Sequence, residues 1–284
     1  MFSRLLKHEW RACAPLLGLL SLAAGGIALL ATIVLRILVN YADRLIEGTE
    51  GWGVIIVVAL GVFLFFSVVA LCVYAVAVQF ILLYRFYKNK YTDEGYLTFT
   101  LPVKTTHIFW SSFLNMLIWM VISFAVVIVV AFLALLFGTA KEGLVNPDIF
   151  DVVKGLIELL GNINLELLLR DNLSIPYLVI LILSVLTAPF YGLFIPMACI
   201  TAGAVLAKKH KILASFGIYY AVNFAVGIVT SVASIAPTMF MMGNGDIAAY
   251  YTISVGIQLV ITLALTIGAY FFTIHVMKRR LNLP

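Results

Sequence analysis

Charge is what this chain of 284 residues has least of. Asp, Glu, Lys and Arg together make up 11% of it, against about 25% in soluble domains. Hydrophobic residues make up 64%, and the mean hydropathy is +1.13. This composition excludes a soluble globular enzyme, a disordered chain and a nucleic-acid-binding domain. We therefore expect membrane lipid, and no nucleic acid, among its partners.

The sequence also lacks the motifs of catalysis and metal binding. Its cysteines, Cys13, Cys72 and Cys199, have no paired spacing, so neither a disulfide framework nor a zinc site is indicated. There is no P-loop, G-x-G-x-x-G, H-E-x-x-H or G-x-S-x-G pattern. We expect no catalytic residues, no metal site and no cofactor in this chain, so any ATP would be hydrolysed, with Mg, on another polypeptide.

Long apolar runs are what the sequence has in place of these motifs. A membrane-spanning helix needs about 20 mainly apolar residues, and six stretches qualify: 14–39, 54–84, 108–137, 175–207, 212–242 and 247–277. No alternating segments typical of a barrel occur. The prediction is an all-α, polytopic membrane protein in which residues 1–284 form a single transmembrane domain.

The few charges are distributed unevenly about these spans. With six spans both termini lie on one side, together with 85–107 and 208–211. That side holds 13 of the 18 basic residues and three of the 13 acids. Since cytoplasmic loops are rich in Lys and Arg, the sequence predicts that both termini are cytoplasmic.

An amphipathic segment precedes the first span. In residues 2–13 the apolar side chains fall at helical spacing on one face: Phe2, Leu5, Leu6 and Trp10. The pattern predicts an interfacial helix with Trp10 at headgroup depth. Pro15 either breaks this helix or begins the first span. Two interpretations stay open: simple anchoring, or an elbow helix that also contacts a cytoplasmic partner.

The loop 85–107 combines a basic start with an apolar centre. Thr92 or Asp93 can cap a short helix that Pro102 would end. Between them lie four large apolar side chains: Tyr96, Leu97, Phe99 and Leu101. An apolar patch in a cytoplasmic loop is typical of an interaction surface. The segment either folds back onto the bundle or the membrane, or inserts into a partner's groove.

These residues resemble a known family. The run DEGYLTFTLPV, the opening FSRLLKHEW and the six-span layout are similar to the permease subunits of bacterial ABC transporters, in the type-2, exporter-like membrane family. The resemblance implies a cell-membrane location, a dimer with a second permease copy or paralogue, and a coupling helix that binds an ATPase subunit. The implied docking residues are Asp93, Glu94, Gly95, Tyr96, Leu97, Phe99, Leu101 and Pro102. It also implies that residues 2–13 are the elbow helix.

This chain departs from the family pattern in its external segment. Its long external piece is 138–174, between the third and fourth spans, where Asn146 and Pro147 predict the start of an amphipathic helix. That helix could be a lid over a pathway exit or could lie on the outer leaflet.

Polar groups inside the spans are few and mild. Asn115, Asn223 and Gln258 are predicted to line a pathway or to hydrogen-bond neighbouring helices. Proton- and ion-coupled transporters place acids or histidines in mid-membrane, and such residues are nearly absent here. The sequence therefore favours an ATP-driven exporter of an amphiphilic substrate (a peptide, lipid or drug). The alternatives are an ATP-independent secondary transporter or channel, and a non-transporting scaffold or sensor subunit.

Overall fold

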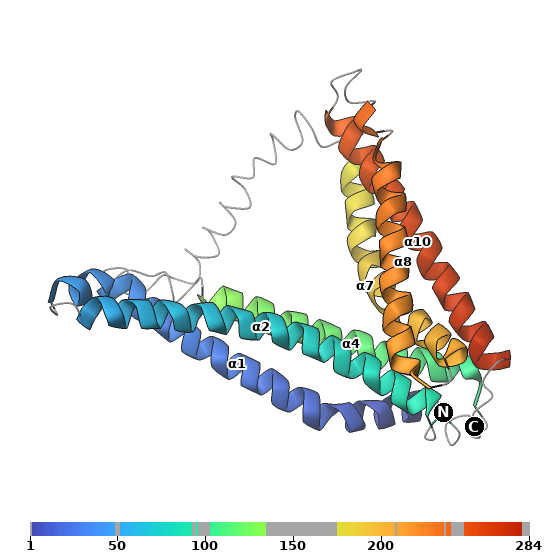
Figure 1. Ribbon diagram of the computed structural model, residues 1–284, viewed down its shortest axis with the longest axis horizontal. Coiled ribbons are helices and arrows are strands. Elements are labelled where there is room, and N and C mark those ends of the chain that lie inside the picture. The colour runs from blue at the N-terminus through green and yellow to red at the C-terminus, as the bar shows by residue number, and fades with distance from the viewer. Residues whose placement is uncertain are drawn as a thin grey trace. The chain divides into compact units, whose positions relative to one another are not determined.

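Six long helices make up almost all of the structure, a computed structural model that describes residues 2–48, 52–92, 95, 103–134, 175–207, 209–235, 237–239 and 247–279 (Figure 1). The helices are α1 (Phe2–Gly48), α2 (Trp52–Tyr91), α4 (Thr105–Leu133), α7 (Ile175–Leu206), α8 (Lys211–Ala233) and α10 (Ile247–Arg279). No strand occurs in these ranges. Each of the six is long and apolar enough to cross a membrane. The predicted all-α, multi-pass fold is confirmed.

The ends of α1, α2 and α8 differ from the predicted spans. The first two helices extend beyond the predicted spans, since α1 runs from Phe2 to Gly48 and α2 runs on to Tyr91. In contrast, α8 ends at Ala233, with Ser234 as its C-cap and the Ser234 amide bonded to the Thr230 carbonyl. Pro237 lies just beyond, and it has no backbone N–H with which to continue the helical hydrogen bonds.

The N-terminal segment also differs from its prediction. Residues 2–13 are the first turns of α1, not a separate helix, and Pro15 lies inside α1. One proline removes a single backbone hydrogen bond, and the many other bonds of a long helix can tolerate that loss. Trp10 stacks on Trp119 of α4, with ring centroids 4.7 Å apart. This face of α1 therefore packs against another helix of the protein.

The described residues form two compact units. Unit 2 contains α1 from Leu6, α2 as far as Leu82 and α4 from Ile118. In this unit hydroxyl groups connect the three helices: the Tyr74 hydroxyl lies 2.8 Å from Ser21 Oγ and donates to Ser123 Oγ at 3.3 Å. Hydrogen bonds of this kind stabilise helix association in lipid, where apolar side chains contact lipid tails as favourably as they contact another helix.

Unit 1 contains Met1–Leu5, the end of α2 from Leu83, the start of α4 as far as Leu117, and the chain from Asn162 onward. In this unit α7 packs against both α8 and α10. Six aromatic rings from α4, α7 and α10 form a continuous cluster: Phe109, Trp110, Phe113, Phe190, Phe194 and Tyr270. Such rings fill large volumes, and their contacts here are tilted or edge-on apart from the stacked pair Phe113–Phe190.

Gly203 allows α7 and α8 to approach closely. A Cβ at Gly203 would lie 2.6 Å from the backbone nitrogen of Ser215. The Ser215 hydroxyl donates to the Lys211 carbonyl at 2.8 Å, one turn earlier in its own helix. The two helices therefore form a tight hairpin, and this contact positions the turn around Lys209 and His210.

Candidate partner-docking site

The base of the 93–102 loop is the last turn of α2. Lys88 and Lys90 stand in this turn, where cations suit the negative end of the helix dipole. The helix ends at Tyr91, which is almost completely buried. A buried tyrosine at the basic end of α2 shows that this end of the helix packs into the protein interior.

Tyr91 connects α2 to α7 through a buried pair of hydroxyls. Its oxygen lies 2.6 Å from Thr201 Oγ1, and Thr201 Oγ1 donates to the Met197 carbonyl at 2.8 Å. Because a threonine hydroxyl has one proton, Tyr91 must be the donor to Thr201. The Tyr91 ring also meets Phe86 edge-on, with centroids 5.8 Å apart. The end of α2 is therefore held against α7 by a specific contact.

Replacing Tyr91 by phenylalanine should weaken this connection. The ring would keep its contacts, but the Thr201 oxygen would lose its donor, so we expect a loss of about 1 kcal/mol in the free energy of unfolding. The measurement is equilibrium unfolding in mixed detergent. Tyr84→Phe, at an exposed position of the same helix, is the control and should leave stability unchanged. Equal stability of the two variants would contradict the assigned bond.

Gly95 lies close against the end of α2. Its amide donates to the Thr92 carbonyl at 2.8 Å, and a Cβ there would lie 2.6 Å from the Lys90 carbonyl oxygen. The Thr92 hydroxyl donates to the Lys88 carbonyl at 2.5 Å. Thr92 therefore bonds back to α2, and the chain turns so tightly that position 95 requires a residue without a side chain.

Most of the predicted docking residues lie outside the described residues. These are Asp93, Glu94, Tyr96, Leu97, Phe99, Leu101 and Pro102; Gly95 alone of the set is described. The external segment 138–174 and its helix near Asn146 also lie outside them. At the other end of the loop, α4 begins at Thr105. The carbonyl of the preceding residue, Lys104, accepts a hydrogen bond from the His107 amide at 2.9 Å.

The residues of the predicted interfacial helix contact other parts of the chain. Phe2 lies beside His107 in unit 1, with ring centroids 6.1 Å apart. Leu5 and Leu6 are half-buried. In unit 2 Trp10 is stacked on Trp119. All four positions thus lie on a helix face that is partly covered.

The three polar residues predicted inside the spans have different surroundings. Asn115 is buried in α4. Asn223 donates to the Tyr219 carbonyl at 2.8 Å, within α8 itself. Gln258 is exposed on α10. For Asn223 the observed bond is to its own helix, and not the contact between helices that was one of the two predicted uses.

The sequence analysis did not identify the Tyr91–Thr201 pair. Its members are 110 positions apart in the chain, and no local pattern marks either of them. The nearest available signal was a tyrosine directly before the loop, next to a basic helix end.

Family models, curated proteins and solved structures give no match to this chain. What the fold itself defines is a multi-pass α-helical membrane protein.

Proposed function

We propose that this chain is the membrane-spanning permease subunit of a bacterial ABC transporter that exports an amphiphilic substrate. It resides in the plasma membrane with both termini in the cytoplasm, as the excess of basic residues on that side favours. ATP and Mg bind to a separate ATPase subunit. A second copy of this chain, or a paralogue, completes the transport pathway.

The observation that carries this proposal is the buried contact between Tyr91 and Thr201. The 93–102 loop connects α2 to α4 along the chain, so a force on the loop acts on both helices directly. The hydroxyl contact adds α7, within the same unit. A loop connected in this way can transmit movement of a cytoplasmic partner to three helices at once, which is what a coupling segment requires.

Gly95 supports the same interpretation. Because the chain turns tightly at Gly95, little slack remains between the loop and α2, and displacement of the loop would not be absorbed at its base. The apolar side chains of Tyr96, Phe99 and Leu101 suit a groove on an ATPase subunit, with Asp93 and Glu94 at the rim.

The test is co-purification with an ATPase subunit encoded beside this chain. Replacing Tyr96, Phe99 and Leu101 together by aspartate would place unpaired carboxylates in an apolar interface, so we expect association to fall by more than about tenfold. Stimulation of ATP hydrolysis should fall with it. The matched control is Leu281→Asp, which adds a carboxylate on the same predicted side and should leave association intact.

Two results would overturn the proposal. Undiminished association and ATPase stimulation in the triple variant would remove the docking role of the loop. Transport that continues after deletion of the ATPase would favour the secondary transporter or channel, while loss of a regulatory response without any transport would favour the scaffold or sensor.

A further inference from the structure

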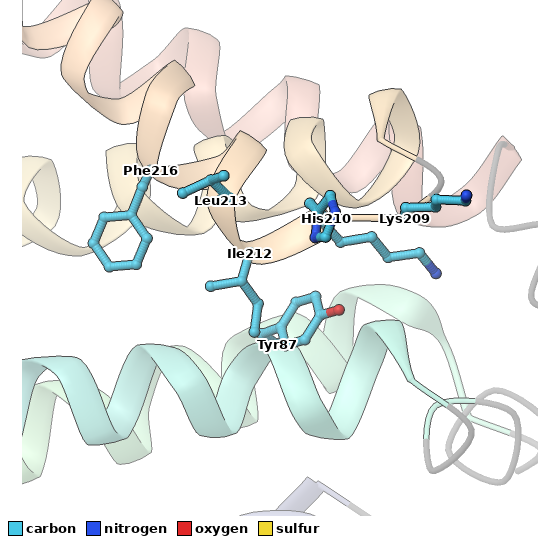
Figure 2. A pocket seen from close by; sticks show the side chains of 7 residues that line it. Tyr87, Lys209, His210, Ile212, Leu213 and Phe216 are labelled. Atoms are coloured by element: carbon cyan, nitrogen blue, oxygen red, sulfur yellow. The ribbon is translucent and has the colours of Figure 1, made fainter.

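An open cleft of about 440 Å³ lies in unit 1 between the last turns of α2 and the start of α8. Tyr87 of α2 and Ile212 of α8 point toward one another across it (Figure 2). The turn before α8 contributes Lys209 and His210 to one end of the cleft. The tight approach of α7 and α8 at Gly203 positions this turn.

The cleft has a cationic end. Lys209 is exposed and Lys211 is half-buried, and both line the cleft. Lys211 is also the first residue of α8, whose first turn contains no acid. A helix N-terminus is itself positive and is usually accompanied by Asp or Glu, so a lysine there adds like charge. His210 precedes the helix and its side chain makes no capping hydrogen bond.

No carboxylate in the described part of unit 1 offsets this charge. Its described residues include no Asp or Glu, whereas they include a set of basic residues: Arg4, Arg85, Lys88, Lys90, Lys104, Lys209, Lys211, Lys278 and Arg279. A helix start with added positive charge and no acid in its first turn departs from the usual charge pattern, and such departures are expected at functional sites. An anion at this end of the cleft would complement the charge of Lys209, Lys211 and the helix start.

The other end of the cleft is apolar. Ile212, Leu213 and Phe216 of α8 line it beyond the lysines, and 43%, 73% and 46% of their respective surfaces are exposed. At a rise of 1.5 Å per residue, Phe216 lies about 7.5 Å further along α8 than Lys211. A ligand in the cleft would therefore meet cations first and an apolar wall next.

We propose that this cleft binds the phosphate group of an anionic membrane phospholipid, with the start of an acyl chain along Ile212, Leu213 and Phe216. Lys209, Lys211 and the first amides of α8 would hold the phosphate, as helix N-termini and basic pockets at membrane boundaries do. The Tyr87 hydroxyl is placed to donate a further hydrogen bond. This inference does not depend on the proposed ATPase partner.

The test uses the purified full chain in detergent and measures retained lipid by native mass spectrometry. Phosphatidylglycerol is the anionic probe and phosphatidylcholine is the probe without net charge. We expect selective retention of phosphatidylglycerol. The double variant Lys209→Gln and Lys211→Gln should weaken this retention about thirtyfold, the combined effect of two lysines on one anionic group. The matched control, Lys104→Gln with Lys278→Gln, removes two charges elsewhere in unit 1 and should retain the lipid.

Two further arms separate a lipid from a free phosphate. Inorganic phosphate at the same concentration should not displace phosphatidylglycerol, and Ile212→Ser should weaken lipid retention several-fold through the loss of apolar contact. Displacement by phosphate, together with no effect of Ile212→Ser, would reduce the site to one for a free anion and overturn the lipid assignment. Equal retention of the two lipids, or equal loss in the two double variants, would overturn the site altogether.

Discussion

Replacing Gly203 by alanine should destabilise the protein by about 2–3 kcal/mol, the upper part of the range typical of an overpacked contact. The added Cβ would lie 2.6 Å from the nitrogen and 2.7 Å from the Cα of Ser215. These are backbone atoms of α8 and cannot rotate away, so the two helices must separate. Alanine favours a helix over glycine by up to about 1 kcal/mol, but this gain is smaller than the expected clash. Equilibrium unfolding in mixed detergent measures the difference.

Gly217→Ala is the matched control for this prediction. It lies in the same hairpin, and a Cβ there would meet nothing within 4 Å. This variant should be neutral or slightly more stable, because only the helix propensity changes. If Gly203→Ala and Gly217→Ala unfolded at the same mole fraction of the denaturing detergent, the close approach of α7 and α8 would be refuted.

Replacing Phe109 by alanine should cost about 3 kcal/mol of stability. Phe109 is fully buried, and its ring lies 5.5 Å from both Phe194 of α7 and Tyr270 of α10. Loss of the ring would leave a cavity and remove aromatic contacts with two helices. We place the effect at the lower end of the range for such substitutions. In a membrane the ring is buried from lipid and not from water, so its burial contributes less transfer free energy. The same unfolding titration, followed by tryptophan fluorescence, measures it.

Phe124→Ala provides the comparison, because Phe124 is on the same helix but is 67% exposed. We expect a change of about 0.5 kcal/mol or less, as is usual away from packed sites. Phe109→Leu should recover part of the loss, because leucine refills some of the cavity. Similar losses for Phe109→Ala and Phe124→Ala would mean that the aromatic cluster is not a stabilising centre.

Hydropathy was sufficient to predict all six helices. A run of about 20 apolar residues has few alternatives to a spanning helix, since lipid leaves no other partner for the backbone groups. The same reasoning cannot locate the helix ends. Pro15 was expected to interrupt or begin a helix, yet it lies inside α1. A proline in a helix interior costs about 3 kcal/mol, which the tertiary packing of that helix, including Trp10 on Trp119, offsets.

The contacts that position the candidate site were beyond prediction for a different reason. Tyr91 and Thr201 are ordinary residues for a helix end and a helix interior, and only the fold brings them together. Gly203 was one of 20 glycines, and its role depends on where Ser215 lies. By contrast, the apolar loop 93–102 was evident from composition, because large apolar side chains rarely gather between basic residues in a segment predicted to be cytoplasmic.

The hydroxyl groups of Ser21, Tyr74 and Ser123 have a consequence for how the first three helices find their rotational register. The apolar residues of α2 are spread around its whole circumference. In lipid, rotating α2 about its axis would therefore present an almost equivalent apolar surface to the neighbouring helices. Hydrogen bonds are directional, and Tyr74 can reach Ser21 and Ser123 together in only one rotational setting of the three helices. Three small polar groups thus choose among orientations that hydrophobicity leaves degenerate.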